Sequence, residues 1–367
     1  MDALFITNLE LNENEGIYKK ICAEATAIGR AVGNCRLLMK CGSGTKVVDT
    51  YSGKTTTKEL DVLMFAKNCV EEDSLKVIYI RLMIPNPSLI ALMKAAKKHG
   101  VEVLYEIPTY PYYGEQFRAS RKKYRAVAKI AIDALFSPFI KKYADHIVII
   151  KSNSKIRLHS KMVEINNGVN TEKIKSKAEY DTKDGVFRMV TVGTLFPYHG
   201  YDRVLAGLKS CNEEVYGHPV EFHVVGASQT INELKEQAQK LGLKRVVFHG
   251  MKTTDELNEM YEKFDVGLGC LALHRRNADI DTTLKIIEYY CRGVPVVTSG
   301  KSPYKNPAVT IQIPDGEDPV DIKSIYSEWK SIDKDELRAL SEQAKKEFSW
   351  DFIMKQLLMT CGIVQGV

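Results

Sequence analysis

Lys285 and Glu288 are the two residues whose types and spacing most directly suggest chemistry. They lie three apart in a segment with helical periodicity, so both face one side of a helix near its N-terminal end. That end presents free backbone N–H groups and the positive pole of the helix dipole, which favour a phosphate. Lys285 adds a full positive charge, and Glu288 can accept hydrogen bonds from a diol such as ribose. The pair therefore predicts a nucleoside diphosphate site. The same spacing also fits an ordinary solvated surface pair, worth only about a few tenths of a kcal/mol.

The segment from 265 to 299 contains the elements that must position this pair. An apolar run of strand length, 266–273, is followed by a polar loop, 274–281. A helix that Asp281 or Thr282 can cap and Gly293 can end comes next, and the apolar run 294–297 follows it directly. This order predicts a β–loop–α–β unit of a parallel sheet covered by helices.

The sequence LKIIEY (284–289) followed by GVPVV (293–297) resembles the donor-binding signature of family 4-type glycosyltransferases with the GT-B fold. The resemblance implies that Glu288 holds the ribose of a nucleotide sugar and that the preceding turn holds its diphosphate. It also implies transfer with retention of configuration and no bound metal. The family often has a second Glu eight residues earlier, where this chain has Ile280 between two aspartates. The implied phosphate contacts are Asp281, Thr282, Thr283, Leu284 and Lys285.

Other loops of the second half fit the same resemblance. Residues 193–203 resemble the phosphate-grip loop of the family, but Thr194 and His199 stand where the family carries an Arg and a Lys. Lys285 and Arg275 or Arg276 are the cations that could substitute, and a neutral His can still donate one hydrogen bond. The resemblance adds four further donor contacts to these: His199, Gly200, Gly250 and Met251.

The first half resembles the family only in its order of elements, an alternation of strands and helices. Gly16, in the loop before a helix predicted for 17–32, is expected to let the backbone approach the donor, although a turn explains a single Gly equally well. Glu106 ends the strand predicted for 101–107, where open α/β sheets bind their ligands. We therefore treat Glu106 as a sugar or acceptor contact and, with Lys285, as a candidate catalytic residue.

The segment 118–142 is rich in Lys and Arg and carries a single acid, Asp133. Aromatic and aliphatic residues alternate with the basic ones, which is typical of a helix on an anionic membrane surface. An ordinary helix packed on the domain core is the alternative, and the sequence leaves the two open. The residues expected at the membrane are Arg118, Arg121, Lys122, Lys123, Arg125 and Lys129.

Length and composition bound these interpretations. The 367 residues fit two domains, and 44% hydrophobic with 27% charged residues is typical of a soluble globular protein. No apolar run reaches the roughly 18 residues that span a bilayer, and the N-terminus lacks a signal pattern. Eight scattered cysteines predict reduced thiols and therefore a cytoplasmic protein. The basic segment 118–142 adds the possibility of peripheral attachment to the inner face of the cell membrane. A net charge of +6 suits acidic ligands without demanding nucleic acid.

We therefore expect a GT-B fold of two Rossmann-like domains facing a cleft, with residues 1–170 as the acceptor side and 186–348 as the donor side. Residues 349–367 are expected to form a helix that returns to the first domain. The expected activity moves a hexose from a nucleotide sugar, with UDP favoured, to a glycan or lipid-linked glycan of a bacterial surface polysaccharide. A non-catalytic subunit that binds sugar or a partner enzyme, and a sugar epimerase, are the rivals. Oligomeric state is left open.

Overall fold

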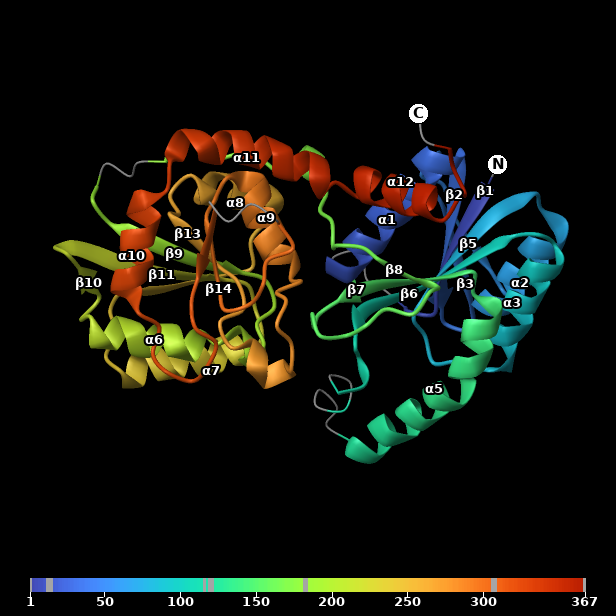
Figure 1. The fold of residues 1–367 in the computed structure, drawn as a ribbon, viewed down its shortest axis with the longest axis horizontal. Helices are drawn as coiled ribbons and strands as arrows, with labels where there is room; N and C mark the ends of the chain where they lie inside the picture. Colours follow the sequence, from blue (N-terminus) through green and yellow to red (C-terminus); the bar gives the residue numbers. More distant parts are fainter. Residues whose placement is uncertain are drawn as a thin grey trace. The chain divides into compact units, whose positions relative to one another are not determined.

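The computed structural model describes residues 2–10, 16–114, 117, 122–180, 184–304 and 309–365, and the chain forms two compact units. Unit 1 consists of residues 1–151, 155–168 and 349–367, and unit 2 of residues 152–154 and 169–348. The first unit is thus built from segments at both ends of the chain (Figure 1).

Unit 1 is built on a sheet with the strand order β4-β3-β2-β1-β5-β6-β7-β8. The strands from β2 to β8 in this order pair in parallel, and β3 and β4 add an antiparallel edge. The strand order reverses between β1 and β5. The strands are β1 (Asp2–Thr7), β2 (Asn34–Cys41), β3 (Gly44–Asp49), β4 (Thr55–Lys58), β5 (Leu75–Arg81), β6 (Glu102–Tyr110), β7 (His146–Lys151) and β8 (Met162–Glu164).

Helices cover both faces of this sheet, and alternate residues of each central strand enter two different cores. Leu4 and Ile6 pack under α2 (Val62–Glu72), α3 (Pro87–Lys98) and α5 (Lys123–Tyr143). Ala3 and Phe5 pack under α1 (Gly16–Val32) and α12 (Trp350–Thr360). Burial on both faces explains why these strands are continuous apolar runs in the sequence.

Unit 2 repeats the plan with parallel strands in the order β12-β11-β9-β13-β14-β15, and β10 pairs antiparallel with β11. Here the order reverses between β9 and β13. The strands are β9 (Phe187–Val192), β10 (Glu214–Val215), β11 (His218–Val225), β12 (Val246–Gly250), β13 (Val266–Leu268), β14 (Val296–Thr298) and β15 (Thr310–Gln312). The α-helices are α6 (Tyr201–Ser210), α7 (Gln229–Lys240), α8 (Thr254–Tyr261), α9 (Leu284–Arg292), α10 (Ile322–Ser331) and α11 (Lys334–Glu347). Short 3₁₀ turns are η1 (Thr171–Lys173), η2 (Pro197–His199) and η3 (Leu273–Arg276).

Two details of the predicted β–loop–α–β unit are wrong. The strand predicted for 266–273 ends at Leu268. The backbone then passes so close to the Asp281 carboxylate that a Cβ at Gly269 would meet Oδ2 at 2.5 Å. The N-cap of α9 is Thr283 rather than Asp281 or Thr282. Asp281 instead accepts a hydrogen bond from the Thr283 backbone N–H and so orders the turn before the helix. The predicted end at Gly293 is confirmed, with φ +73°.

Within the described residues, no helix is long and apolar enough to cross a membrane. In the segment with the predicted membrane contacts, the described helix α5 begins at Lys123, with Lys122 as its N-cap. Arg118 and Arg121, two of the predicted membrane contacts, lie outside the described residues.

Candidate functional site

The point where the strand order of unit 2 reverses brings two loops and a helix end together. The loop after β9 runs from Gly193 to Gly200, and the loop after β13 leads into α9. In open parallel sheets this reversal opens a crevice at the carboxyl ends of the strands, where ligands bind. Because both loops start from neighbouring strands, residues 84 and 94 positions apart in the chain meet here.

Lys285 reaches from the first turn of α9 toward the end of β9. Its Nζ atom donates to the Tyr201 hydroxyl at 3.1 Å and to the Thr191 hydroxyl at 3.4 Å. Burial lowers the pKa of Lys285 from 10.5 to about 8. Among the described residues, Lys285 hydrogen-bonds only to neutral hydroxyls and forms no ion pair, although the Asp281 charge acts to raise its pKa. A phosphate at the α9 N-terminus would add a direct anionic partner.

Glu288 lies one turn further along α9, and one of its two carboxylate oxygens already accepts hydrogen bonds within the protein. Its Oε1 atom accepts from Arg292 Nε and Nη2 at 3.1 and 2.8 Å. Arg292 is buried and stacks on the Tyr261 ring with a separation of 4.2 Å, so it holds the carboxylate in place. No hydrogen bond reaches Oε2 among the described residues, and the side chain is 26% exposed. Oε2 is therefore the acceptor that the site leaves for a ligand.

Asp281 is completely buried, and its contacts lie within unit 2. One oxygen accepts from the Cys270 N–H at 2.6 Å and the Thr298 hydroxyl at 3.1 Å. The other accepts from the Thr283 N–H and hydroxyl at 3.1 and 2.7 Å. With both oxygens engaged, Asp281 shapes the turn that presents Thr282, Thr283 and Leu284 at the helix start. Leu284 is the first helical residue and is exposed.

His199 occupies the grip-loop position of the family lysine as a neutral side chain. Its Nδ1 atom accepts from the Phe196 backbone N–H at 3.0 Å, so the proton resides on Nε2. Burial and the nearby charges of Lys285 and Arg276 lower the pKa of His199 well below its usual range. The next residue, Gly200, has φ +71° and approaches Ala272 so closely that a Cβ would lie 2.8 Å from the Ala272 Cβ. The loop thus brings an uncharged donor to the site.

Arg275, a predicted phosphate contact, has its guanidinium engaged by acids of its own unit. It forms a two-fold hydrogen-bonded pair with Asp202 at 2.8 Å and also pairs with Glu317. These bonds raise the pKa of Arg275 above its usual value. Arg275 therefore links η3 to α6, and its positive charge is already balanced by Asp202 and Glu317.

Gly250 and Met251, the predicted base contacts, end β12 and begin the following loop. Gly250 has φ +68°, with open space around its Cα, and the Met251 side chain is 75% exposed. Gly16 is likewise surrounded by open space but forms the first residue of α1 rather than a free loop. The roles of these three residues stay predictions.

Glu106, the predicted catalytic acid of unit 1, is buried in an ion cluster. Both of its oxygens accept from Arg81 Nη1, at 3.1 and 3.0 Å, and Lys20 Nζ lies 3.7 Å away. Glu24 shares the same two cations, and burial raises its pKa to about 7. Arg81 is the last residue of β5, but Glu106 lies in the middle of β6, which runs from Glu102 to Tyr110, so the predicted position of Glu106 at a strand end is wrong. Its carboxylate is already paired with Arg81. Its contact with a sugar or acceptor stays a prediction.

Sequence reasoning missed the partners that make the site work. Tyr201, Thr191 and Arg292 set the environment of Lys285 and Glu288. Tyr201 lies within the grip-loop segment 193–203 but was assigned no role there, and Thr191 and Arg292 lie outside the motifs used to find the site. Only the i, i+4 spacing of Glu288 and Arg292 could have indicated one of these pairs.

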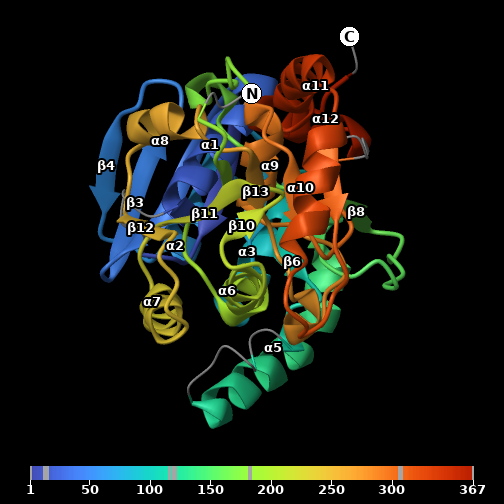
Figure 2. The same ribbon diagram turned by 90° about the vertical axis from the view of Figure 1, so that its left-hand side faces the viewer.

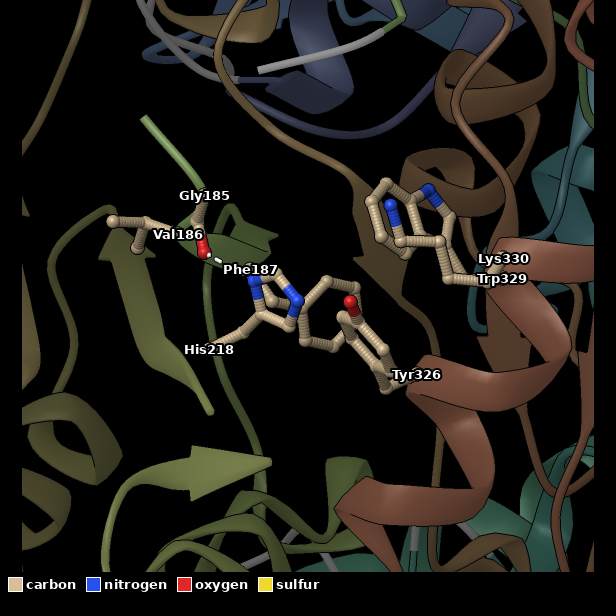
Figure 3. A pocket seen from close by; sticks show the side chains of 7 residues that line it. All are labelled: Gly185, Val186, Phe187, His218, Tyr326, Trp329 and Lys330. Carbon is tan, nitrogen blue, oxygen red and sulfur yellow. Dashed lines mark hydrogen bonds between the residues drawn. The ribbon is translucent and has the colours of Figure 1, made fainter. Parts of the chain in front are cut away.

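A small pocket of about 40 Å³ elsewhere in unit 2 is lined by aromatic residues, including Phe187, His218, Tyr326 and Trp329 (Figure 3). Phe187 begins β9 and His218 begins β11, so the pocket lies at the opposite end of the strands from Lys285. It is not part of the candidate site.

Solved structures of similar fold cover almost the whole chain. The chain resembles sucrose-phosphate synthase from Thermosynechococcus elongatus, with a TM-score of 0.62, 13% identity and 98% of both chains covered. It also resembles WaaG, a glycosyltransferase involved in lipopolysaccharide biosynthesis, with a TM-score of 0.58 and 14% identity over the whole of both chains. A third solved structure, described as trehalose-6-phosphate from E. coli bound with UDP-2-fluoro glucose, has a TM-score of 0.58 and 10% identity, again over the whole of both chains.

These likenesses confirm the predicted GT-B fold. No curated protein sequence matches the chain. The family model described as "Glycosyl transferases group 1" matches residues 186–317, which contain Lys285, Glu288 and the loops around them. The match confirms the resemblance found in the sequence. Residues 186–317 are therefore similar to the glycosyl transferases group 1 family, within a chain that has the GT-B fold.

Proposed function

We propose that this protein transfers a hexosyl group from a nucleoside diphosphate sugar, with UDP as the favoured nucleotide, to a glycan or lipid-linked glycan acceptor. Transfer proceeds with retention of configuration and without a bound metal. The observation that carries the proposal is the arrangement on α9. Within the described residues, the buried Lys285 at the helix N-terminus forms no ion pair, and one turn later Oε2 of Glu288 accepts no hydrogen bond.

These features match the parts of a nucleotide sugar. The helix N-terminus and Lys285 would hold the diphosphate and stabilise the charge that develops as it leaves. Oε2 of Glu288 would accept a hydrogen bond from a ribose hydroxyl. The bound UDP-2-fluoro glucose in a protein of the same fold supports a uridine nucleotide as donor.

Calorimetric titration with UDP, GDP and ADP tests the donor site. We expect UDP to bind most tightly and Glu288→Ala to lose roughly 1.5–3 kcal/mol of binding free energy, the value of a hydrogen bond to a charged group.

Because the same substitution leaves buried Arg292 without its partner, Glu288→Gln is the second variant. It keeps an oxygen acceptor for Arg292 and removes the charge offered to the ribose. Glu236→Ala on α7, in the same unit, is the control and should bind as wild type. Unchanged UDP affinity in both Glu288 variants would remove the ribose assignment.

One observation favours a second candidate function, a non-catalytic subunit that binds sugar or a partner glycosyltransferase. Thr194 and neutral His199 stand where the family carries two cations, and Arg275 is already balanced by acids. Release of UDP from UDP-glucose and other UDP-hexoses, followed over time with a mixture of glycan acceptors, separates the two functions. Tight UDP binding with no UDP release from any of these sugars would favour the subunit.

A further inference from the structure

Helix α5 packs on the rest of unit 1 through a narrow face that includes an acidic residue. Ala126, Asp133 and Ile140 are its buried residues, and the Tyr112 hydroxyl donates to the Asp133 carboxylate. The helix packs beside α3 and then extends beyond it, away from the sheet of unit 1 (Figures 1 and 2). The sole acid of α5 is therefore turned inward.

The outward side of α5 is apolar. At 100° per residue, the arc opposite Ala126 carries large apolar side chains that are between 40% and 68% exposed. Small residues fill the space between them, and no polar residue interrupts the arc before Lys142 at the helix end. Within the described part of the chain, nothing covers this face. Its large members are Tyr124, Val127, Ile132, Leu135 and Phe139.

Basic residues border the apolar face on both sides. Lys123 and Lys141 lie along one edge, and Arg125 and Lys129 along the other. All four are exposed, and Arg125 stacks on the ring of Tyr124. An apolar stripe with cationic borders fits a bilayer with anionic head groups, where the stripe enters the acyl boundary and the cations meet lipid phosphates.

A groove continues the apolar face toward α3. It has a volume of about 260 Å³ and is lined by Pro87, Ile90, Ala91, Lys94, Phe136 and Phe139. Phe139 belongs to both surfaces, so the apolar area does not end at the edge of α5. An acyl chain next to the inserted helix would find apolar walls in this groove.

We propose that α5 docks unit 1 on an anionic lipid bilayer, with Tyr124, Val127, Leu135 and Phe139 inserted and the four bordering cations against lipid phosphates. A second copy of the chain is a poorer occupant. Because both borders are basic and the only acid is buried, pairing two such faces in either direction sets positive charge against positive charge. The proposal is independent of the donor site.

Co-sedimentation of the full chain with lipid vesicles tests this proposal. We expect binding to vesicles of equal parts phosphatidylcholine and phosphatidylglycerol, much weaker binding to phosphatidylcholine alone, and release at high salt. Arg125→Gln with Lys129→Gln should weaken binding about 30-fold, since each cation near the surface contributes about 1 kcal/mol. Val127→Ser with Leu135→Ser should weaken it at least about tenfold through loss of inserted apolar area.

Matched variants elsewhere in unit 1 control for charge and surface hydrophobicity. Lys40→Gln with Lys58→Gln removes the same charge from exposed strand positions, and Leu60→Ser with Met64→Ser removes two exposed apolar side chains near and on α2. Both should bind vesicles as wild type.

Wild-type protein that stays in the supernatant, or α5 variants that bind as well as wild type, would overturn the proposal. So would sedimentation showing a dimer that Val127→Ser with Leu135→Ser dissociates, because the face would then join two copies. UDP affinity, measured in parallel, should be the same for all variants.

Discussion

At the scale of single residues, the protonation of Lys285 couples donor binding to pH. Burial lowers its pKa to about 8, and a phosphate beside it would raise that pKa again. Since the charged amine is the form that binds, binding above about pH 8 must include uptake of a proton. We therefore expect UDP affinity to be level between pH 7 and 8 and then to fall about tenfold per pH unit.

Calorimetry from pH 7 upward, in two buffers of different ionisation enthalpy, measures both the affinity and the proton uptake. Lys285→Met keeps the apolar stem and should give weak binding without this fall. An equal UDP affinity at pH 7 and at a pH well above 8 in wild type would show that Lys285 does not meet the phosphate.

Residue types and spacing singled out the two candidate ligand contacts of α9, Lys285 and Glu288. They did not predict the protonation of these side chains or their hydrogen-bond partners within the protein. The spacing of Lys285 and Glu288 predicted their helix, and the structure confirms it. Nothing in that spacing shows that Lys285 meets Tyr201 and Thr191, because these belong to α6 and β9, far from Lys285 in the sequence. The neutral state of His199 also depends on the Phe196 N–H and on burial, which appear only when the loop is folded.

At the scale of elements, the loop that carries His199 ends at a glycine whose replacement should destabilise unit 2. Gly200 has φ +71° and packs against Ala272, so a side chain meets both backbone strain and a steric clash. Gly200→Ala should lower the free energy of unfolding of unit 2 by roughly 2–4 kcal/mol, of which roughly 1–2 kcal/mol is the left-handed backbone and the rest is overpacking. Gly242→Ala is the matched control, with φ +70° and open space around it, and should show only the backbone cost.

The chain contains two tryptophans, Trp329 in unit 2 and Trp350 in unit 1. Urea unfolding followed by fluorescence in a Trp350→Phe background therefore reports on unit 2 alone. Equal losses for Gly200→Ala and Gly242→Ala would contradict the clash.

Most elements could be predicted from the sequence where apolar periodicity was strong and the ends carried caps. The helix predicted for 17–32 is confirmed as α1, which runs from Gly16 to Val32. Helices α2 and α10 were missed, although Asp61 and Asp321 cap them with side-chain hydrogen bonds. Their apolar residues are buried by neighbours distant in sequence, so the local pattern alone did not distinguish them from loops.

At the scale of the whole molecule, helix α12 completes the core of unit 1 from the far end of the chain. Trp350, Met354, Leu357 and Leu358 are buried beside Phe5 and Ile28. Met354→Ala should therefore lower the free energy of unfolding of unit 1 by roughly 2–5 kcal/mol, as expected for a large side chain removed from a packed core. Phe352→Ala on the same helix is the control, because that side chain is 45% exposed, and should change the free energy by about 0.5 kcal/mol or less.

Urea unfolding in a Trp329→Phe background follows unit 1 through Trp350. A Met354→Ala protein as stable as Phe352→Ala would show that α12 contributes little to this core.

Because unit 1 is built from both ends of the chain, it can complete its folding only after unit 2 has been translated. A ribosome delivers residues up to 168 with the face of the sheet that holds Phe5 and Tyr79 covered by α1 but still lacking α12. All of unit 2 must then be translated before that helix emerges. Although domains made first generally fold first, here the second globule can close while the first remains open with an apolar face exposed. During translation the nascent chain must therefore keep that face from aggregating, and the unit that starts first is finished last.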